Sequence, residues 1–114
     1  MRLMRPEDYP QQEPVSAFAQ AYTDDLISRI DLDSGENHFY GSNPYQSIAL
    51  FRPERPNGTV LGFMHGGGWT NGYKEMMGYM APAFTRRGVL FASIGYRLAP
   101  MHPWPACFDE QFLL

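Results

Sequence analysis

The sequence has a single cysteine and no long apolar run. Cys107 cannot form a disulfide within the chain, which fits a reducing compartment. The N-terminal stretch 1–14 turns polar after Pro6 and lacks the apolar core of a signal peptide, and no segment approaches the ~20 apolar residues that cross a bilayer. We therefore expect a cytoplasmic protein without a membrane partner.

Basic residues are also scarce. Lys and Arg number 9 against 12 Asp and Glu, a formal net charge of −3, and no basic patch is visible. A phosphate backbone would have to bind against this field, so we expect no nucleic-acid partner. The three histidines, His38, His65 and His102, and the lone cysteine have no metal-site spacing, and we expect no metal and no cofactor.

By composition the chain divides into two parts. Residues 1–35 combine a proline-containing arm, which should be irregular, with an apolar pattern of three- and four-residue steps over about 15–30. That pattern predicts one amphipathic helix or two short ones. Residues 36–114 alternate strand and helix patterns, after a polar stretch at 31–44 that we interpret as a loop.

Three apolar runs predict strands, at 45–51, 59–64 and 89–95. The second and third are apolar on both faces, as strands buried in a parallel or mixed sheet are. We expect the first strands to be antiparallel or mixed and the sheet to become parallel after residue 59. Strand 89–95 should have a neighbour on each side, and we expect one of its edges to be exposed in this chain.

Two further segments predict helices. One lies within 74–87, where Pro82 should divide it into two pieces because a proline ring clashes with the carbonyl four residues earlier. The other starts near Cys107 and runs through Phe112 to Leu113-Leu114 without a capping signal. An order of strand, strand, helix, strand and start of helix is the opening of an α/β sheet, and we interpret the chain as truncated.

A run of three glycines follows strand 59–64, in His65-Gly66-Gly67-Gly68-Trp69. Glycines permit dihedrals that other residues avoid and leave no Cβ in front of the backbone amides. Consecutive amides of this kind can hold an oxygen that becomes negatively charged during acyl transfer. A plain glycine-rich turn stays an alternative, and a phosphate site is disfavoured because no Gly-Lys-Ser/Thr ending is present.

The glycine run together with two later segments, Gly95-Tyr96-Arg97-Leu98-Ala99-Pro100 and His102-Pro103-Trp104-Pro105-Ala106, resembles the N-terminal part of an α/β-hydrolase. The match is to the esterase group of hormone-sensitive-lipase-like carboxylesterases and kynurenine formamidase (arylformamidase)-like enzymes. The arm and the stretch 40–45 look more like the formamidase branch. The resemblance implies an α/β fold, with a mixed sheet becoming parallel and helices on its faces, cut before the nucleophile elbow.

In this family the backbone amides matching Gly67 and Gly68 form the oxyanion hole, with a third donor after the nucleophile. By resemblance, His65 and Gly66 would support the loop, and His65 would not be the base of the triad. Trp69, next to the turn, is expected either to line the substrate pocket or to clamp a helix beneath it. Such enzymes act on a small-molecule ester or amide, and a homodimer of the full-length protein is left open.

The resemblance also extends to the second turn. Tyr96 and Arg97 would anchor the turn after strand 89–95. Family members often carry an acidic residue after the Ala-Pro pair, where this chain has Met101. This departure puts an ion pair at that loop in doubt.

No serine in the chain has the Gly-x-Ser-x-Gly setting that the family's nucleophile requires. Ser93 lies in an apolar strand and is expected to be a buried hydroxyl, and Cys107 a small buried apolar residue. We therefore expect the parent to be a serine hydrolase of carboxylic esters or aryl formamides, and the 114 residues alone to be inactive. A noncatalytic binding module, or a subunit completed by another chain, is the alternative.

Overall fold

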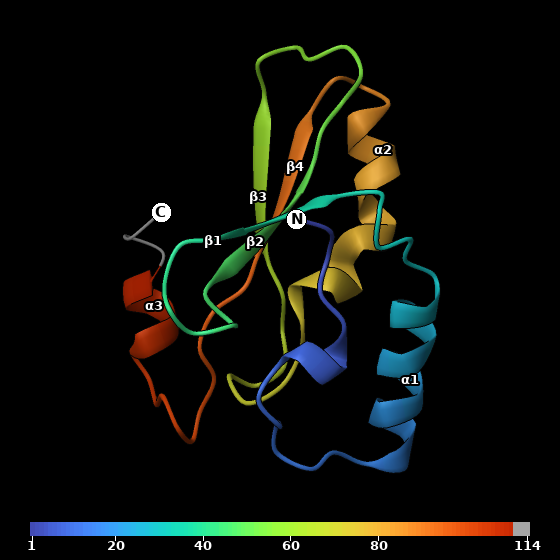
Figure 1. Ribbon diagram of the computed structural model, residues 1–114. Helices are drawn as coiled ribbons and strands as arrows, with labels where there is room; N and C mark the ends of the chain where they lie inside the picture. Colours follow the sequence, from blue (N-terminus) through green and yellow to red (C-terminus); the bar gives the residue numbers. More distant parts are fainter. Residues whose placement is uncertain (111–114) are drawn as a thin grey trace.

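The computed structural model describes residues 1–110, and its centre is a four-stranded sheet with the order β1-β2-β4-β3 (Figure 1). Strands β1 and β2 are antiparallel, as are β2 and β4, whereas β3 and β4 are parallel. The expected mixed sheet that becomes parallel after residue 59 is confirmed. The strands are β1 (Glu36–Phe39), β2 (Ser47–Phe51), β3 (Val60–Met64) and β4 (Leu90–Ile94).

The helices lie on both sides of these strands. Helices η2 and α2 pack against β4, α1 packs against η2, and α3 lies on the opposite side in the view of Figure 1. Among residues 1–110, no helix combines the length and apolarity needed to span a membrane. The helices are η1 (Pro6–Asp8), α1 (Ala17–Ser28), η2 (Lys74–Met80), α2 (Ala81–Thr85) and α3 (Ala106–Glu110).

The helical segment after the glycine run is divided as predicted. Pro82 lies in the first turn of α2, directly after η2 ends at Met80. Its missing N–H removes no helical hydrogen bond at that position. Gly88 follows α2 with a φ of +83° and donates its amide to the Thr85 carbonyl at 3.0 Å, which ends the helix.

Three predictions about the sheet are wrong. The stretch 31–44 is not entirely a loop, because β1 lies within it and pairs with β2. Strand β3 is not buried on both faces, since it stands at the end of the strand order and Val60 is 62% exposed. Strand β4 has a partner on each side, so among the described residues the open parallel edge belongs to β3 and not to β4.

Helix α1 is a single helix, and some of its apolar residues are exposed to solvent. It begins where the Ser16 hydroxyl accepts a hydrogen bond from the Ala19 amide at 3.1 Å. Phe18 and Tyr22 are largely exposed, and Leu26 is the buried residue of the helix. The apolar spacing therefore predicted the helix correctly, but not which of its side chains are buried.

The N-terminal arm belongs to the core. Its path is irregular apart from η1, as expected, yet it contributes residues to both buried clusters. Cys107 is buried as predicted, and burial raises the pKa of its thiol. One cluster comprises Met4, Tyr9, Tyr45, Tyr96, Leu98 and Cys107, and the other comprises Leu3, Ala49, Phe51, Ala81 and Phe91. The predicted helix positions Gln111 and Phe112 lie outside the described residues.

Candidate functional site

Three segments meet at one end of the sheet. Strands β3 and β4 run parallel, and Met64 is paired with Ile94 at the end of their register. The segments that follow these two strands therefore start side by side, which is where open α/β sheets place their sites. In Figure 1 the N-terminal arm passes the same end of the sheet, below the strands.

The backbone of the glycine run requires glycine at two of its three positions. Gly67 and Gly68 have φ values of +142° and +65°, a region that favours glycine. A Cβ on Gly67 would also lie 1.9 Å from the Asn71 carbonyl oxygen, whereas one on Gly68 or Gly66 would meet nothing within 4 Å. Trp69 continues the turn with a φ of +68°.

The turn is closed through a carbonyl and not through the glycine amides. The Gly67 carbonyl accepts hydrogen bonds from the amides of Thr70 at 3.2 Å and Asn71 at 3.1 Å. Within residues 1–110, the amides of Gly67 and Gly68 donate no hydrogen bond, and both glycines are exposed. Two consecutive N–H groups are thus available to an acceptor from outside the loop.

His65 is buried beneath this turn. Its Nδ1 lies 2.8 Å from the Gly66 carbonyl oxygen, and the Tyr96 hydroxyl donates to the His65 carbonyl at 2.5 Å. The rings of His65 and Tyr96 stack with centroids 4.5 Å apart. Burial lowers the pKa of His65 and raises that of Tyr96 to about 12. A neutral imidazole and a neutral phenol therefore fasten the glycine loop to the segment after β4.

Acid is expected to destabilise the fold through His65. Because burial lowers the pKa of His65 below its ordinary value of about 6.5, the unfolded chain binds more protons than the folded one. The contribution of this residue to stability is full above pH 6.5. It falls by at most about 1.4 kcal/mol per pH unit as the pH drops below that value. Urea unfolding at pH 7.5 and at pH 5 measures the loss.

Two variants serve as controls. In His65→Gln the loss of stability that His65 causes at low pH should disappear, and in His38→Gln it should persist. The His38 side chain is 51% exposed. Equal acid sensitivity of the wild type and His65→Gln would show that another group is responsible.

Trp69 contacts the segment that follows β4. Its ring lies 6.0 Å from Tyr96, edge-on, and 5.4 Å from Trp104, measured between centroids. The Ala99 amide donates to the Trp69 carbonyl at 2.8 Å. Trp69 and Trp104 remain 47% and 58% exposed. An aromatic surface therefore stands beside the glycine turn.

Arg97 finds its acidic partner in α3. Its backbone amide donates to Glu110 Oε2 at 2.9 Å, and its Nε donates to Glu110 Oε1. Glu110 is 1% exposed and also accepts from the Tyr40 hydroxyl at 3.2 Å and from Gln46 Nε2 at 3.3 Å. Met101 is 83% exposed, so the ion pair of this loop uses a carboxylate that lies further along the chain.

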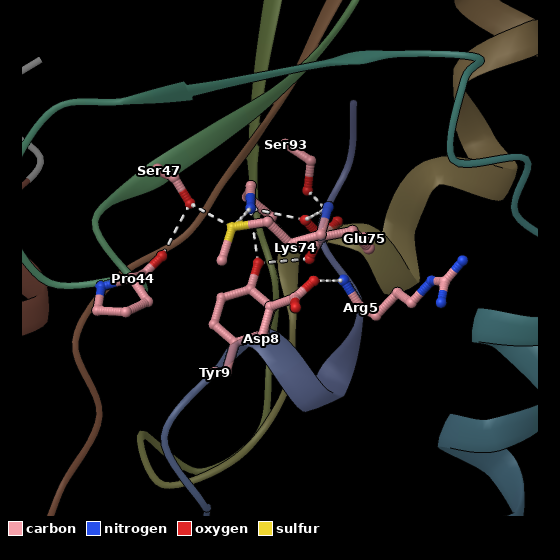
Figure 2. A network of polar contacts seen from close by, with 9 residues as sticks. Arg5, Asp8, Tyr9, Pro44, Ser47, Lys74, Glu75 and Ser93 are labelled. Atoms are coloured by element: carbon pink, nitrogen blue, oxygen red, sulfur yellow. Dashed lines mark hydrogen bonds and ion pairs between the residues drawn. The ribbon is translucent and has the colours of Figure 1, made fainter. Parts of the chain in front are cut away.

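The sequence analysis missed a buried ion pair at the start of η2, to which Tyr9 of the arm is bonded (Figure 2). Lys74 and Glu75 are each 1% exposed, and Lys74 Nζ lies 2.6 Å from Glu75 Oε2. The Tyr9 hydroxyl accepts from Lys74 Nζ at 2.6 Å and donates to Glu75 Oε1 at 2.7 Å. Burial and the Glu75 charge raise the pKa of Tyr9, which keeps its proton on the phenol.

The arm also reaches the glycine loop itself. Gln12 Nε2 donates to the Gly72 carbonyl at 2.7 Å, and the Gly72 amide donates to Gln12 Oε1 at 2.9 Å. Asn71 Nδ2 donates to the Glu13 carbonyl at 2.7 Å. No local pattern in the sequence points to these contacts, because they join residues about sixty positions apart.

A cavity of about 360 Å³ opens between the arm and the two loops. Such a volume lies at the small end of the range for small-molecule pockets. Its lining includes Gln12, Tyr45, Thr70, Leu98, Pro100 and His102.

The other candidates from the sequence have structural roles. Ser93 is fully buried, as predicted, and donates to the Lys74 carbonyl at 2.7 Å. Among residues 1–110, no group of three or more His, Cys, Asp or Glu side chains is arranged to hold a metal ion. The site is therefore built from backbone amides, aromatic rings and a buried polar scaffold.

Comparison with known proteins identifies the fold. Residues 61–113 match the family model described as the alpha/beta hydrolase fold, a range that includes the glycine run and both later segments. Esterase LipC of Mycobacterium tuberculosis is 37% identical over 71 residues, covering 58% of this chain and 17% of LipC. Tuliposide A-converting enzyme b1 of Tulipa gesneriana is 41% identical over 54 residues, covering 45% of this chain and 14% of that enzyme.

Solved structures share the same arrangement of elements. Esterase B of Lactobacillus rhamnosis superimposes with a TM-score of 0.69 at 22% identity, covering 85% of this chain and 34% of that one. The bacterial heroin esterase superimposes with a TM-score of 0.66 at 20% identity, covering 95% of this chain and 38% of that one. The protein has the alpha/beta hydrolase fold, and it is similar in sequence to an esterase. It spans less than a fifth of the length of the curated relatives above.

Proposed function

We propose that the protein is a serine hydrolase that cleaves carboxylic esters or aryl formamides through an acyl-enzyme. The observation that carries the proposal is the pair of consecutive amides, Gly67 and Gly68, that make no hydrogen bond within residues 1–110. In the reaction, a serine oxygen adds to the substrate carbonyl, and the carbonyl oxygen takes the negative charge. The two amides stabilise that charge, while Gly66 and His65 hold the loop.

The surroundings of the turn support a small organic substrate. Trp69 and Trp104 offer half-exposed aromatic surface next to the amides. The cavity between the arm and the loops is lined by Thr70, which follows Trp69 in the chain, and by His102. In this proposal Trp69 contacts the substrate. The amides and rings require no cofactor, and the single buried thiol of Cys107 fits a cytoplasmic location.

The nucleophile and its acid and base must come from outside residues 1–114, because the sequence contains no Gly-x-Ser-x-Gly motif. The chain covers 17% of LipC and 14% of the tulip enzyme, which leaves ample room for these groups in a protein of similar length.

The test is to read the coding sequence beyond codon 114 and to assay the product of the complete reading frame. We expect an in-frame Gly-x-Ser-x-Gly within about 60 residues, then an acid and a histidine. We also expect turnover of p-nitrophenyl acetate or an aryl formamide that a serine-directed phosphonate abolishes. Residues 1–114 expressed alone should be inactive.

Two outcomes contradict the proposal. A stop codon after Leu114, or a complete frame without the motif, would favour the noncatalytic module or a subunit completed by another chain. Phosphonate-sensitive turnover by residues 1–114 alone would require a nucleophile that the sequence does not contain in the required setting.

A further inference from the structure

We infer that Gln12 is a positioning residue that fixes the conformation of the glycine loop, and through it the two amides of Gly67 and Gly68. The inference rests on the proposed function for its catalytic consequence. Its structural part stands on the contacts of Gln12 alone. The primary amide of Gln12 pairs with both the N–H and the C=O of Gly72, at 2.9 and 2.7 Å, as a neighbouring strand would.

Gln12 binds the stretch 71–72, which packs against the backbone of Gly67. Asn71 and Gly72 form one short stretch, and the Asn71 amide donates to the Gly67 carbonyl at 3.1 Å. The Asn71 carbonyl oxygen stands where a Cβ of Gly67 would be, 1.9 Å away. This hydrogen bond and the close approach of the Asn71 carbonyl tie the position of the Gly67 backbone to that of Asn71.

The same stretch also packs on His65. A Cβ on Gly72 would lie 2.5 Å from His65 Nδ1 and 2.7 Å from the Gly66 carbonyl oxygen, so the Gly72 backbone lies directly against this ring. Pulling Gly72 toward Gln12 sets the distance between the His65 ring and the outer turn. Gln12 thus acts on both ends of the glycine run through one residue.

The arm is hydrogen-bonded to the core directly before Gln12. Three residues before Gln12, the Tyr9 hydroxyl is bonded to the buried pair Lys74 and Glu75. Between them, the Pro10 carbonyl accepts a hydrogen bond from the Tyr45 hydroxyl at 2.5 Å. Gln12 therefore directly follows a stretch of the arm that is bonded to the core.

The experiment uses the protein expressed from its complete reading frame and two variants, Gln12→Met and Gln12→Glu. Methionine keeps the length of the side chain without either hydrogen bond. Gln20, an exposed residue of α1 whose side chain donates to Asp24, provides the control, Gln20→Met. Active sites are titrated with the phosphonate, so that misfolded protein does not enter the rates.

For Gln12→Met we expect kcat per titrated site to fall about tenfold with KM within twofold, since the amides are misplaced but not removed. The affinity for a trifluoromethyl ketone, which presents an oxyanion, should fall by the same factor. Gln20→Met should behave as the wild type. An unchanged kcat in Gln12→Met would overturn the positioning role.

Gln12→Glu adds a pH dependence of kcat that tests the two hydrogen bonds to Gly72. A carboxylate cannot donate to the Gly72 carbonyl, whereas a protonated carboxyl can donate to it and still accept from the Gly72 amide. The ratio of kcat in this variant to kcat in the wild type should therefore rise from pH 7 to pH 5. A ratio that stays flat would contradict the two-bond pairing.

Amide hydrogen exchange separates this inference from the proposed function. The backbone N–H of Asn71 donates to the Gly67 carbonyl, whereas only the Asn71 side chain reaches Gln12, at 3.4 Å. This backbone N–H should therefore lose protection in Gln12→Met only if the loop loosens. If the complete protein has no esterase activity but Asn71 loses protection, the proposed function fails and the structural inference holds. Unchanged protection of Asn71 overturns the inference whatever the activity.

Discussion

Replacing Gly67 by alanine is expected to lower kcat of the complete enzyme by at least about 10²–10³, the usual effect of losing one oxyanion donor. The added methyl would lie 1.9 Å from the Asn71 carbonyl oxygen, a backbone atom that cannot turn away as a side chain does. The φ of +142° at Gly67 is also unfavourable for any side chain. The loop must therefore change its path, and the amides move with it. Steady-state kinetics on titrated enzyme measure the loss.

Two other glycines make the comparison specific. Gly58 has a φ of +87° in an exposed turn with nothing near its Cβ position, so Gly58→Ala carries backbone strain away from the site. It should cost about 1–2 kcal/mol of stability with unchanged kcat. Gly68→Ala, also strained but without a clash, should keep the fold and lose activity. Equal kcat for Gly67→Ala and Gly58→Ala would refute the assignment of the amides.

Replacing Glu75 by leucine is expected to destabilise the fold by about 3–5 kcal/mol, because it leaves the Lys74 ammonium buried without a counter-charge. Such a loss is a large part of the 5–15 kcal/mol that a domain usually has. Burial lowers the pKa of Lys74, and Glu75 opposes that effect, so the variant also favours loss of the Lys74 proton. Urea unfolding gives the change from the midpoint at constant slope.

The matched variant removes both charges. Lys74→Met combined with Glu75→Leu should recover part of the stability, because no unpaired charge is left, while the buried Tyr9 hydroxyl loses both of its partners. An exposed pair offers the control: Asp25→Ala breaks the contact with Arg29, where both side chains are more than half exposed, and should change little. If the double variant is as unstable as Glu75→Leu, the cost does not come from the unpaired Lys74 charge, and that explanation is wrong.

The sequence predicted the sheet where apolar runs are bounded by turn residues. Strands β2, β3 and β4 lie within the predicted ranges 45–51, 59–64 and 89–95. Strand β1 was missed because its residues, Glu36 to Phe39, are mostly polar and become a strand only by pairing with β2. The edge position of β3 was also missed, since an apolar run says that a strand can be buried but not where it lies in the strand order.

The sequence motifs predicted the glycine loop and its neighbours, but not the residues that hold the loop in place. Gln12, Tyr9 and the pair Lys74–Glu75 carry no local signal, because each acts through contacts with residues 60 or more positions away or through burial that the fold creates. Glu110 likewise became the partner of Arg97 only when α3 folded back onto the loop. Long-range packing decides these contacts, and no sequence period encodes it.

The strand order has a consequence for synthesis on the ribosome. Within residues 1–110, β3 pairs only with β4, which is translated about thirty residues later. A nascent chain that has just exposed β3 has no place in the sheet for it, and the glycine run behind it lacks Tyr96 and Ala99, which fasten it. The glycine turn is therefore assembled after the scaffold, in the slow step that closes the non-local contacts.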